Sequence, residues 1–236
     1  MEKPFVICHM FTSMDGKIDG AFMSDPAAVP ARTEYGNLRS FYGCNATLYG
    51  TVTMAGGFAD GWEKHVPSSP THFPKEDWLS PSETGYYIIS VDPKGELGWS
   101  SGYIEKKGRP RARAIEVLTE QVSNDYLAYL RGYGVSYLFA GKEQLDCALL
   151  FHKLKTQLGI EKLMLAGGGY MNGSFLTAGL IDEVSIVIAP VADGNTKSVS
   201  VFERFEYLPN QKPTPFTLLE AKRMDGDGLW LRYAAK

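Results

Sequence analysis

The stretch from Leu163 to Ala189 constrains the fold most, because it predicts a strand, a glycine turn, a short helix and a second strand with no spare residues between them. The short apolar run Leu163–Ala166 is typical of a buried strand, and Gly167, Gly168 and Gly169 follow it directly. Glycine lacks a Cβ, so three in succession let the backbone approach a ligand closely. The free N–H groups and positive dipole end of the next helix would stabilise a pyrophosphate there. Taken alone, the turn is equally compatible with ordinary packing, since it does not match G-x-G-x-x-G.

Strand-like and helix-like patterns alternate along the rest of the chain. Strands are expected at Pro4–Phe11, Ala46–Tyr49, Tyr86–Val91, Ala112–Leu118, Val135–Ala140, Lys162–Ala166 and Val184–Ala189, and helices at Thr33–Tyr42, Asn124–Arg131, Lys142–Gln157 and Met171–Ala178. This alternation favours an α/β fold with a mainly parallel central sheet and flanking helices. The MDGDG turn between Phe216–Lys222 and Leu229–Tyr233 predicts a C-terminal antiparallel hairpin. We expect one domain over residues 1–236, with polar surface insertions near residues 59–84 and 192–215.

Composition narrows the class of protein. A net charge of −3 and a 44% hydrophobic share indicate a globular protein and argue against nucleic acid or an anionic membrane as the main partner. Cys8, Cys44 and Cys147 are odd in number and far apart, which argues against a disulfide framework or a metal site. No run approaches the roughly 18 apolar residues that a membrane span requires, and the N-terminus resembles a strand rather than a signal peptide. We therefore expect a cytoplasmic protein.

Polar residues follow the first strand and recur on the next helix. In an open α/β sheet, ligands bind beyond the carboxyl ends of the strands, where the loop containing Asp15 and Lys17 lies. These two residues are the best-placed catalytic candidates: Lys17 would donate a hydrogen bond to a substrate oxygen, and Asp15 would orient Lys17. An exposed turn explains the pair equally well. Arg32 and Arg39 are seven residues apart, near one helix face, and could hold a phosphate. A solvated helix face is the commoner explanation of such a pair.

The order of these motifs is more specific than any one of them. Ser-Met-Asp-Gly-Lys follows the first strand, Ala-Arg and Leu-Arg occupy the next helix, Leu-Tyr-Gly-Thr-Val-Thr follows the second strand, and Gly-Gly-Gly precedes Ala-Gly-Leu-Ile-Asp-Glu. Over Phe5–Ala189 this order resembles the reductase domain of bifunctional riboflavin-biosynthesis proteins. The resemblance implies a dihydrofolate-reductase-like fold, a homodimer, and NADPH-dependent reduction of the ring-opened ribosyl chain of 5-amino-6-(5-phosphoribosylamino)uracil.

The resemblance also implies roles for individual residues. The substrate side would include Arg32, Arg39 and Ala166. The cofactor NADPH would contact Gly50, Thr53, Ser90, Gly167, Gly168, Gly169, Tyr170, Met171 and Asn172, with Ser90 near its adenosine end. Thr53 is also expected to cap a short helix after the second strand.

Three alternatives stay open because the match is imperfect. Ala166 stands where the family usually has an acidic residue, and its methyl group cannot hydrogen-bond a substrate, so a different substrate is the first alternative. A dihydrofolate reductase proper would need a carboxylate on the first helix, where Glu34 is the acidic candidate. A nucleotide-binding homologue without catalysis would keep the glycine turn alone.

One basic cluster remains, formed by Lys106, Lys107, Arg109, Arg111 and Arg113. It is compatible with binding the 2′-phosphate of NADPH, with a nucleic-acid contact, or with a solvated loop and strand edge. We favour the solvated edge, and the net charge makes a nucleic-acid contact the weakest of the three.

Overall fold

The structure is a computed structural model that describes residues 2–63, 65–81, 83–209 and 212–236. It divides into two compact units: unit 1 comprises the residues up to Pro4 together with Asn45–Glu161, and unit 2 comprises Phe5–Cys44 and Lys162–Lys236. The regions of the two predicted insertions contain no helix or strand among their described residues. That they are insertions in a single domain stays a prediction.

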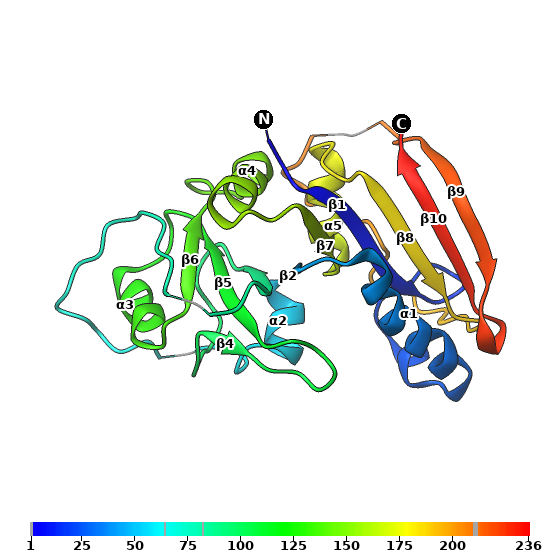
Figure 1. The fold of residues 1–236 in the computed structure, drawn as a ribbon, viewed down its shortest axis with the longest axis horizontal. Helices are drawn as coiled ribbons and strands as arrows, with labels where there is room; N and C mark the ends of the chain where they lie inside the picture. The colour runs from blue at the N-terminus through cyan, green and yellow to red at the C-terminus, as the bar shows by residue number, and fades with distance from the viewer. Residues whose placement is uncertain (1, 64, 82, 210–211) are drawn as a thin grey trace. The chain divides into compact units, whose positions relative to one another are not determined.

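Unit 1 is built on a mostly parallel sheet (Figure 1). Its strands are β2 (Ala46–Gly50), β3 (Tyr87–Val91), β4 (Tyr103–Ile104), β5 (Ala112–Leu118) and β6 (Ser136–Phe139), and its helices are α2 (Thr51–Gly57), α3 (Asn124–Gly132) and α4 (Cys147–Leu158). Strands β2, β3, β5 and β6 run parallel, and the short β4 is antiparallel to β5. Every residue of β5 is buried, as expected for a parallel strand covered on both faces.

Unit 2 combines parallel strands with an antiparallel hairpin (Figure 1). Its strands lie in the order β7 (Lys162–Leu165), β1 (Phe5–Thr12), β8 (Glu183–Ile188), β10 (Leu229–Ala235) and β9 (Phe216–Arg223), and its α-helices are α1 (Val29–Tyr42) and α5 (Gly169–Thr177). Strand β1 pairs in parallel with β7 and β8, whereas β10 is antiparallel to both β8 and β9. The predicted fold class and the C-terminal hairpin are confirmed.

Capping side chains explain where helices differ from their predicted bounds. Helix α4 begins at Cys147 rather than at Lys142, because the Asp146 carboxylate accepts a hydrogen bond from the N–H of Leu149 and starts the helix there. Helix α1 begins at Val29, four residues before the predicted start, with Pro30 in its first turn. The expectation that Thr53 caps α2 is wrong, since Gly50 is the N-cap residue and the helix begins at Thr51.

A buried polar network lies between α1 and the sheet of unit 2. His9 is fully buried, and its Nε2 donates to the carbonyl oxygen of Tyr35 at 3.0 Å. Its Nδ1 therefore accepts from the Ser185 hydroxyl at 2.9 Å, and that hydroxyl accepts from the indole N–H of Trp230. Burial is the main reason that the pKa of His9 is lowered to about 4. The imidazole is thus neutral and holds α1 against β1 and β8.

Candidate active site

The glycine turn after β7 has one position open to a ligand. Gly168 has a φ of +50°, and a Cβ built on it would meet no atom within 4 Å. Helix α5 begins immediately afterwards, and no side chain among the described residues caps its N-terminus. Ala166, at the end of β7, is 8% exposed. Backbone room at Gly168 and an uncapped helix start are what a bound phosphate requires.

Gly169 and Gly173 serve a different purpose. The backbone at Ser200 and Glu203 passes so close to them that a side chain would not fit. A Cβ on Gly169 would lie 2.3 Å from the carbonyl oxygen of Ser200, and one on Gly173 would lie 1.7 Å from that of Glu203. These two glycines are therefore required by packing within the protein. The glycines at these two positions of the sequence are thus explained without a ligand.

Two of the next residues of α5, Tyr170 and Asn172, contact the part of the chain near Ser200 and Glu203. Asn172 is fully buried and its amide donates to the carbonyl oxygen of Val201 at 2.9 Å, while its Oδ1 has no partner among the described residues. Tyr170 is 44% exposed, and its ring contacts that of Phe205 with the centroids 4.8 Å apart. Met171 is half-buried. The predicted cofactor contacts of these three residues stay predictions.

Asp15 lies at the centre of a hydrogen-bonded loop. Its carboxylate accepts from the Ser13 hydroxyl at 2.6 Å and from the N–H groups of Asp193 and Gly194 at 2.9 and 3.0 Å. These hydrogen bonds, that from Ser13 first, hold the pKa of the Asp15 carboxyl well below its usual range. Asp15 is therefore ionised at neutral pH and is suited to orienting its neighbours rather than to donating a proton.

Lys17, the second predicted catalytic residue, is tied to the same loop. Its ammonium donates to the carbonyl oxygen of Ser198 at 3.2 Å, and its backbone forms a bridge with Ser200. An ammonium group has three donors, so the remaining ones are available to a ligand. The structure brings Asp15 and Lys17 together within unit 2.

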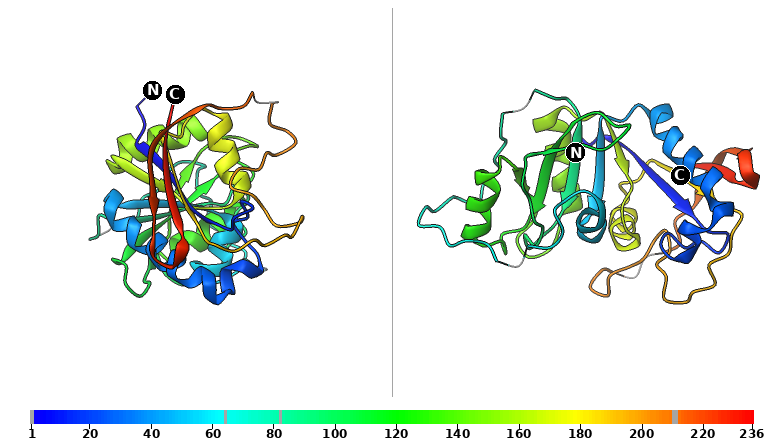
Figure 2. Two further views of the ribbon diagram at one scale, coloured as in Figure 1. Left: turned by 90° about the vertical axis from the view of Figure 1, so that its right-hand side faces the viewer. Right: turned by 90° about the horizontal axis from the view of Figure 1, so that it is seen from below.

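The residues from Val191 to Glu203, here called the 191–203 segment, connect the Asp15 loop to the glycine turn (Figure 2). Met14 N–H donates to the Val191 carbonyl oxygen at 2.8 Å, and Glu203 N–H donates to the Gly169 carbonyl oxygen at 2.9 Å. Residues at the ends of β1 and β7 are thereby joined through a segment from much later in the sequence. Sequence patterns gave no sign of this connection, because its hydrogen bonds are made mostly by the backbone.

The two predicted phosphate-binding arginines lie on α1 in different environments. Arg32 is exposed and its Nη1 donates to the carbonyl oxygen of Met23 at 2.8 Å. Arg39 is half-buried, and its positive charge contributes to the lowered pKa of His9. Both belong to unit 2, as do the glycine turn and the Asp15 loop.

The remaining predicted residues belong to unit 1. Gly50 is the N-cap of α2, and Thr53 is half-buried on the first turn of that helix. Ser90 is fully buried inside β3, with Glu116 as its register partner on β5, and its hydroxyl has no partner among the described residues. The side chain of Ser90 therefore has no surface to offer an adenosine group in this conformation.

Sequence analysis missed two buried carboxyl groups near Ser90. Glu116 Oε1 accepts from the Trp99 indole at 2.6 Å, whereas its Oε2 has no partner among the described residues. Burial, reinforced by the charge of Asp92, raises the pKa of Glu116 well above its usual range. Burial also raises the pKa of Asp92, to about 6. The available signal was the presence of two charged residues, Arg113 and Glu116, inside the predicted strand Ala112–Leu118.

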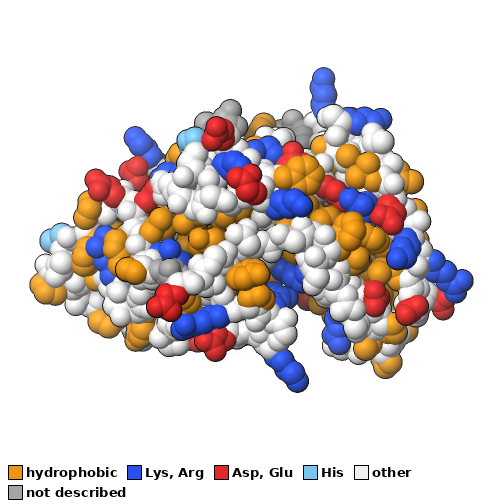
Figure 3. Space-filling model, in the orientation of Figure 1, with side chains coloured by type: hydrophobic (Ala, Val, Ile, Leu, Met, Phe, Trp, Pro, Cys, Tyr) orange, Lys and Arg blue, Asp and Glu red, His pale blue; other side chains and the backbone are white. Residues whose placement is uncertain are grey.

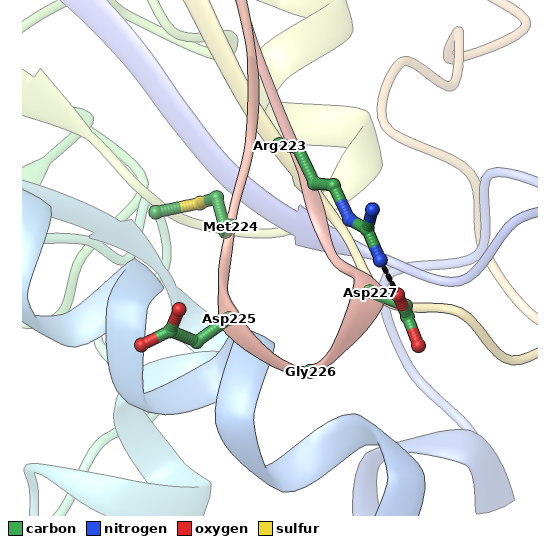
Figure 4. A pocket seen from close by; sticks show the side chains of 5 residues that line it. All are labelled: Arg223, Met224, Asp225, Gly226 and Asp227. Atoms are coloured by element: carbon green, nitrogen blue, oxygen red, sulfur yellow. Dashed lines mark hydrogen bonds and ion pairs between the residues drawn. The ribbon is translucent and has the colours of Figure 1, made fainter.

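A shallow pocket at the tip of the C-terminal hairpin contains none of the predicted site residues. It is lined by Arg223, Met224, Asp225, Gly226 and Asp227. Figure 4 shows Arg223 turned toward Asp227, with which it forms an ion pair, while Asp225 points to the other side of the turn. The pocket is therefore a feature of the hairpin turn itself.

In the part of the chain that the structure describes, no helix has both the length and the apolar character that crossing a membrane requires. Within the same residues, no group of three or more His, Cys, Asp or Glu side chains is arranged to hold a metal ion.

A family model described as the RibD C-terminal domain matches residues 4–227. The chain belongs to this family. A curated relative, the 2,5-diamino-6-ribosylamino-4(3H)-pyrimidinone 5′-phosphate reductase of Methanothermobacter thermautotrophicus, is 49% identical over 55 residues, which are 23% of this chain and 25% of the relative. The match thus spans about a quarter of that relative's length.

Two solved structures share the fold of this chain. A pyrimidine reductase-like protein from Corynebacterium diphtheriae superposes with a TM-score of 0.70 at 14% identity, covering 99% of this chain and 92% of that one. RibD from Acinetobacter baumannii gives a TM-score of 0.66 at 20% identity, covering 99% of this chain and 58% of that chain. The chain therefore spans little more than half of the Acinetobacter protein.

Proposed function

We propose that this RibD C-terminal domain protein is an NADPH-dependent reductase of the riboflavin-pathway type. Its substrate would be 5-amino-6-(5-phosphoribosylamino)uracil or a related phosphorylated pyrimidine. The match of the family model over residues 4–227 carries this proposal. The printed name of the Methanothermobacter relative, a reductase of a ribosylaminopyrimidinone 5′-phosphate, supports the same substrate class. The three unpaired cysteines are consistent with action in the cytoplasm.

The geometry of the glycine turn fits the pyrophosphate of a dinucleotide. Gly168 leaves open space in front of the backbone, and the N–H groups at the start of α5 favour negative charge. When bound, NADPH would supply the hydride for the reduction. The protein would contribute mainly by orienting the two reactants.

The residues of the Asp15 loop have distinct proposed roles. Lys17 would hydrogen-bond a substrate oxygen through a donor that Ser198 does not use. Asp15 would act indirectly, because its carboxylate fixes the loop through Ser13, Asp193 and Gly194. Ala166 offers the substrate only a small apolar surface at the end of β7.

The proposal is tested by following NADPH oxidation with three substrates. These are the phosphoribosylamino-uracil, the diaminopyrimidinone of the curated relative, and dihydrofolate. Turnover of either pyrimidine supports the proposal and identifies the preferred substrate. Turnover of dihydrofolate alone would identify a different reductase of the same fold. Tight NADPH binding without any turnover would indicate a non-catalytic nucleotide-binding homologue.

The arginines of α1 provide a prediction about the substrate phosphate. If Arg32 and Arg39 hold it, replacing either with alanine should raise KM roughly ten- to a hundredfold with little change in kcat, because a charge-assisted contact contributes about 1.5–3 kcal/mol. Steady-state kinetics with the phosphorylated substrate measure this change. The dephosphorylated substrate is the control, since neither substitution should alter its kinetics. Equal kcat/KM for both substrates in the wild type would contradict the assignment.

The C-terminal hairpin leads us to propose a homodimer. Trp230 faces α1, where its ring contacts Phe41, so Tyr233, three residues later on β10, lies on the opposite face. Leu218 pairs with Tyr233 and is 52% exposed on that face. An exposed leucine on an edge strand favours association, and a second copy of this chain would cover it.

Light scattering at micromolar concentration should give the mass of a dimer, and Leu218→Arg should give that of a monomer. A matched control is Lys222→Glu, because Lys222 pairs with Trp230 and so lies on the face that α1 approaches. The control should remain dimeric. A monomeric wild type would contradict the prediction.

A further inference from the structure

Strand β6 would form an open edge of the unit 1 sheet without the chain that passes beside it. On one side β6 pairs with β5, and on its other side no strand among the described residues pairs with it. The run Val135–Ala140, VSYLFA, contains no charged residue, glycine or proline, and its valine, tyrosine and phenylalanine favour strands. An open edge with such a sequence pairs with an identical strand of another molecule. This strand therefore needs a cover.

Residues 69–80, here called the 69–80 segment, close this edge. Trp78 N–H donates to the Tyr137 carbonyl oxygen at 2.9 Å, and Tyr137 N–H donates to the Trp78 carbonyl oxygen at 2.8 Å. Phe139 N–H donates to the Asp77 carboxylate at 2.8 Å, and the Phe139 carbonyl oxygen accepts from Lys153 Nζ at 2.8 Å. Alternate residues of a strand direct their backbone groups to the same edge, so Tyr137 and Phe139 belong to the edge away from β5. All four of these groups have partners.

Asp77 ties the segment to α4 as well as to β6. Its carboxylate forms an ion pair with Lys153 at 2.7 Å and accepts from the Gln157 amide at 2.8 Å. The side chains of Lys153 and Asp77 are 19% and 17% exposed, so solvent and salt screen this pair less than a surface ion pair. One carboxylate thus holds the segment beside β6 through three partners.

The first turn of α3 fixes the other end of the segment (Figure 1). Asn124 Oδ1 accepts from Phe73 N–H at 2.8 Å, and the Asn124 amide donates to the Thr71 carbonyl oxygen at 2.9 Å. The Asp125 carboxylate accepts from Ser69 N–H at 2.9 Å. Side chains of α3 therefore bind the backbone of the segment at three points. The segment is held at both ends and crosses the edge of β6 between them.

We propose that the 69–80 segment is an intramolecular cover that prevents β6 from pairing with β6 of a second copy of this chain. In place of Trp78, Tyr137 of a second copy would form the same two backbone hydrogen bonds, because antiparallel pairing of identical strands is symmetric about a twofold axis. Pro74 and Pro81 flank the bridged residue and lack an N–H group, so the segment is itself a poor template for a further strand.

The rest of the molecule indicates what opening this edge would produce. On the face shown in Figure 3, hydrophobic side chains are interspersed with acidic, basic and polar ones. The proposed dimer contact lies on the C-terminal hairpin of unit 2, whereas the 69–80 segment and β6 belong to unit 1. Pairing through β6 would therefore add a second interface and join dimers into larger assemblies. The inference does not depend on the proposed function, since it involves none of the proposed site residues.

The test releases the segment in the double variant Asp77→Ala/Trp78→Pro. The substitutions remove the carboxylate that holds the segment and one backbone donor of the bridge. At low protein concentration, the amides of Tyr137 and Phe139 should exchange with solvent at least roughly tenfold faster than in the wild type, as followed by NMR. At increasing concentration, light scattering should give about twice the wild-type mass or more. Glu76→Ala, which removes an exposed neighbouring carboxylate, is the matched control and should change neither measurement.

A synthetic peptide of residues 69–80 distinguishes edge pairing from aggregation of unfolded protein. An excess of this peptide should return the double variant to the wild-type mass, whereas the same peptide carrying both substitutions should not. Thermal unfolding checks that each variant is folded. If the double variant does not fold, Asp77→Ala alone takes its place, with faster exchange expected at Phe139, which loses its acceptor.

Two results would overturn the inference. In the first, the amides exchange faster but the mass equals that of the wild type at every concentration, so an open β6 edge does not pair with a second copy. In the second, the exchange of both amides is unchanged in a folded variant, so the 69–80 segment is not what covers the edge.

Discussion

Replacing Gly168 with aspartate is expected to weaken NADPH binding by a hundredfold or more. The new carboxylate would enter the open space in front of the turn, where the pyrophosphate is proposed to bind. Two like charges 4 Å apart repel by about 4 kcal/mol at the effective dielectric constant of a protein surface. Repulsion of this size is worth several hundredfold in affinity. The measurement is a fluorescence titration with NADPH.

Gly168→Ala is the matched control for the backbone. Any residue with a Cβ is strained at a φ of +50°, so both variants lose some stability, but only aspartate adds a charge. Gly173→Ala should behave differently, because its Cβ would collide with the Glu203 carbonyl oxygen and lower the melting temperature. Equal NADPH affinities in the aspartate and alanine variants would show that Gly168 serves the fold alone.

Replacing Glu116 with glutamine is expected to stabilise the protein increasingly as the pH rises. Burial raises the pKa of Glu116, so the folded state keeps a proton that the unfolded state releases above its ordinary pKa, near 4.5. While this holds, the free energy of unfolding of the wild type falls by about 1.4 kcal/mol for each pH unit. Glutamine resembles the protonated carboxyl and does not titrate.

Urea unfolding between pH 7 and 9 tests this expectation best. The pKa of His9 is lowered to about 4, so its stabilising contribution is lost only as the pH falls from about 6.5 toward 4 and is constant above pH 7. Asp92, with a pKa of about 6, is largely ionised in the same window. Glu120→Gln, at an exposed position, should show no such trend. If the stability difference between wild type and Glu116→Gln is independent of pH, Glu116 is ionised in the folded protein.

Most of the fold could be predicted from local patterns. The strand Ala112–Leu118 was predicted with its observed bounds, because its Ala, Ile, Val and Leu residues are typical of a buried parallel strand despite two charged positions. The start of α4 was predicted too early, since Leu145 extended the apolar stripe and the capping by Asp146 was overlooked. The two-residue strand β4 was not predicted, because so short a segment has no periodicity.

The candidate site was less predictable, because its contacts are made between distant residues. Asp15 was identified as polar and well placed, but its partners Asp193 and Gly194 belong to the 191–203 segment, which has no regular structure. Ser90 occupies a strand that was predicted correctly, yet both faces of β3 are covered, so Ser90 is buried beside Glu116 and is not open to a ligand. Spacing along the chain indicates neither feature.

The close approach of Glu203 to Gly173 implies that these parts of the gene cannot change independently during evolution. An alanine at position 169 or 173 is compatible only with a backbone near residues 200–203 that follows another path. Relatives in which the 191–203 segment is shortened or rerouted should therefore have lost both glycines. Gly168 faces open space, so the same relatives should keep it for as long as they bind a dinucleotide. Comparing many family sequences would thus separate the ligand-binding glycine from those that the packing requires.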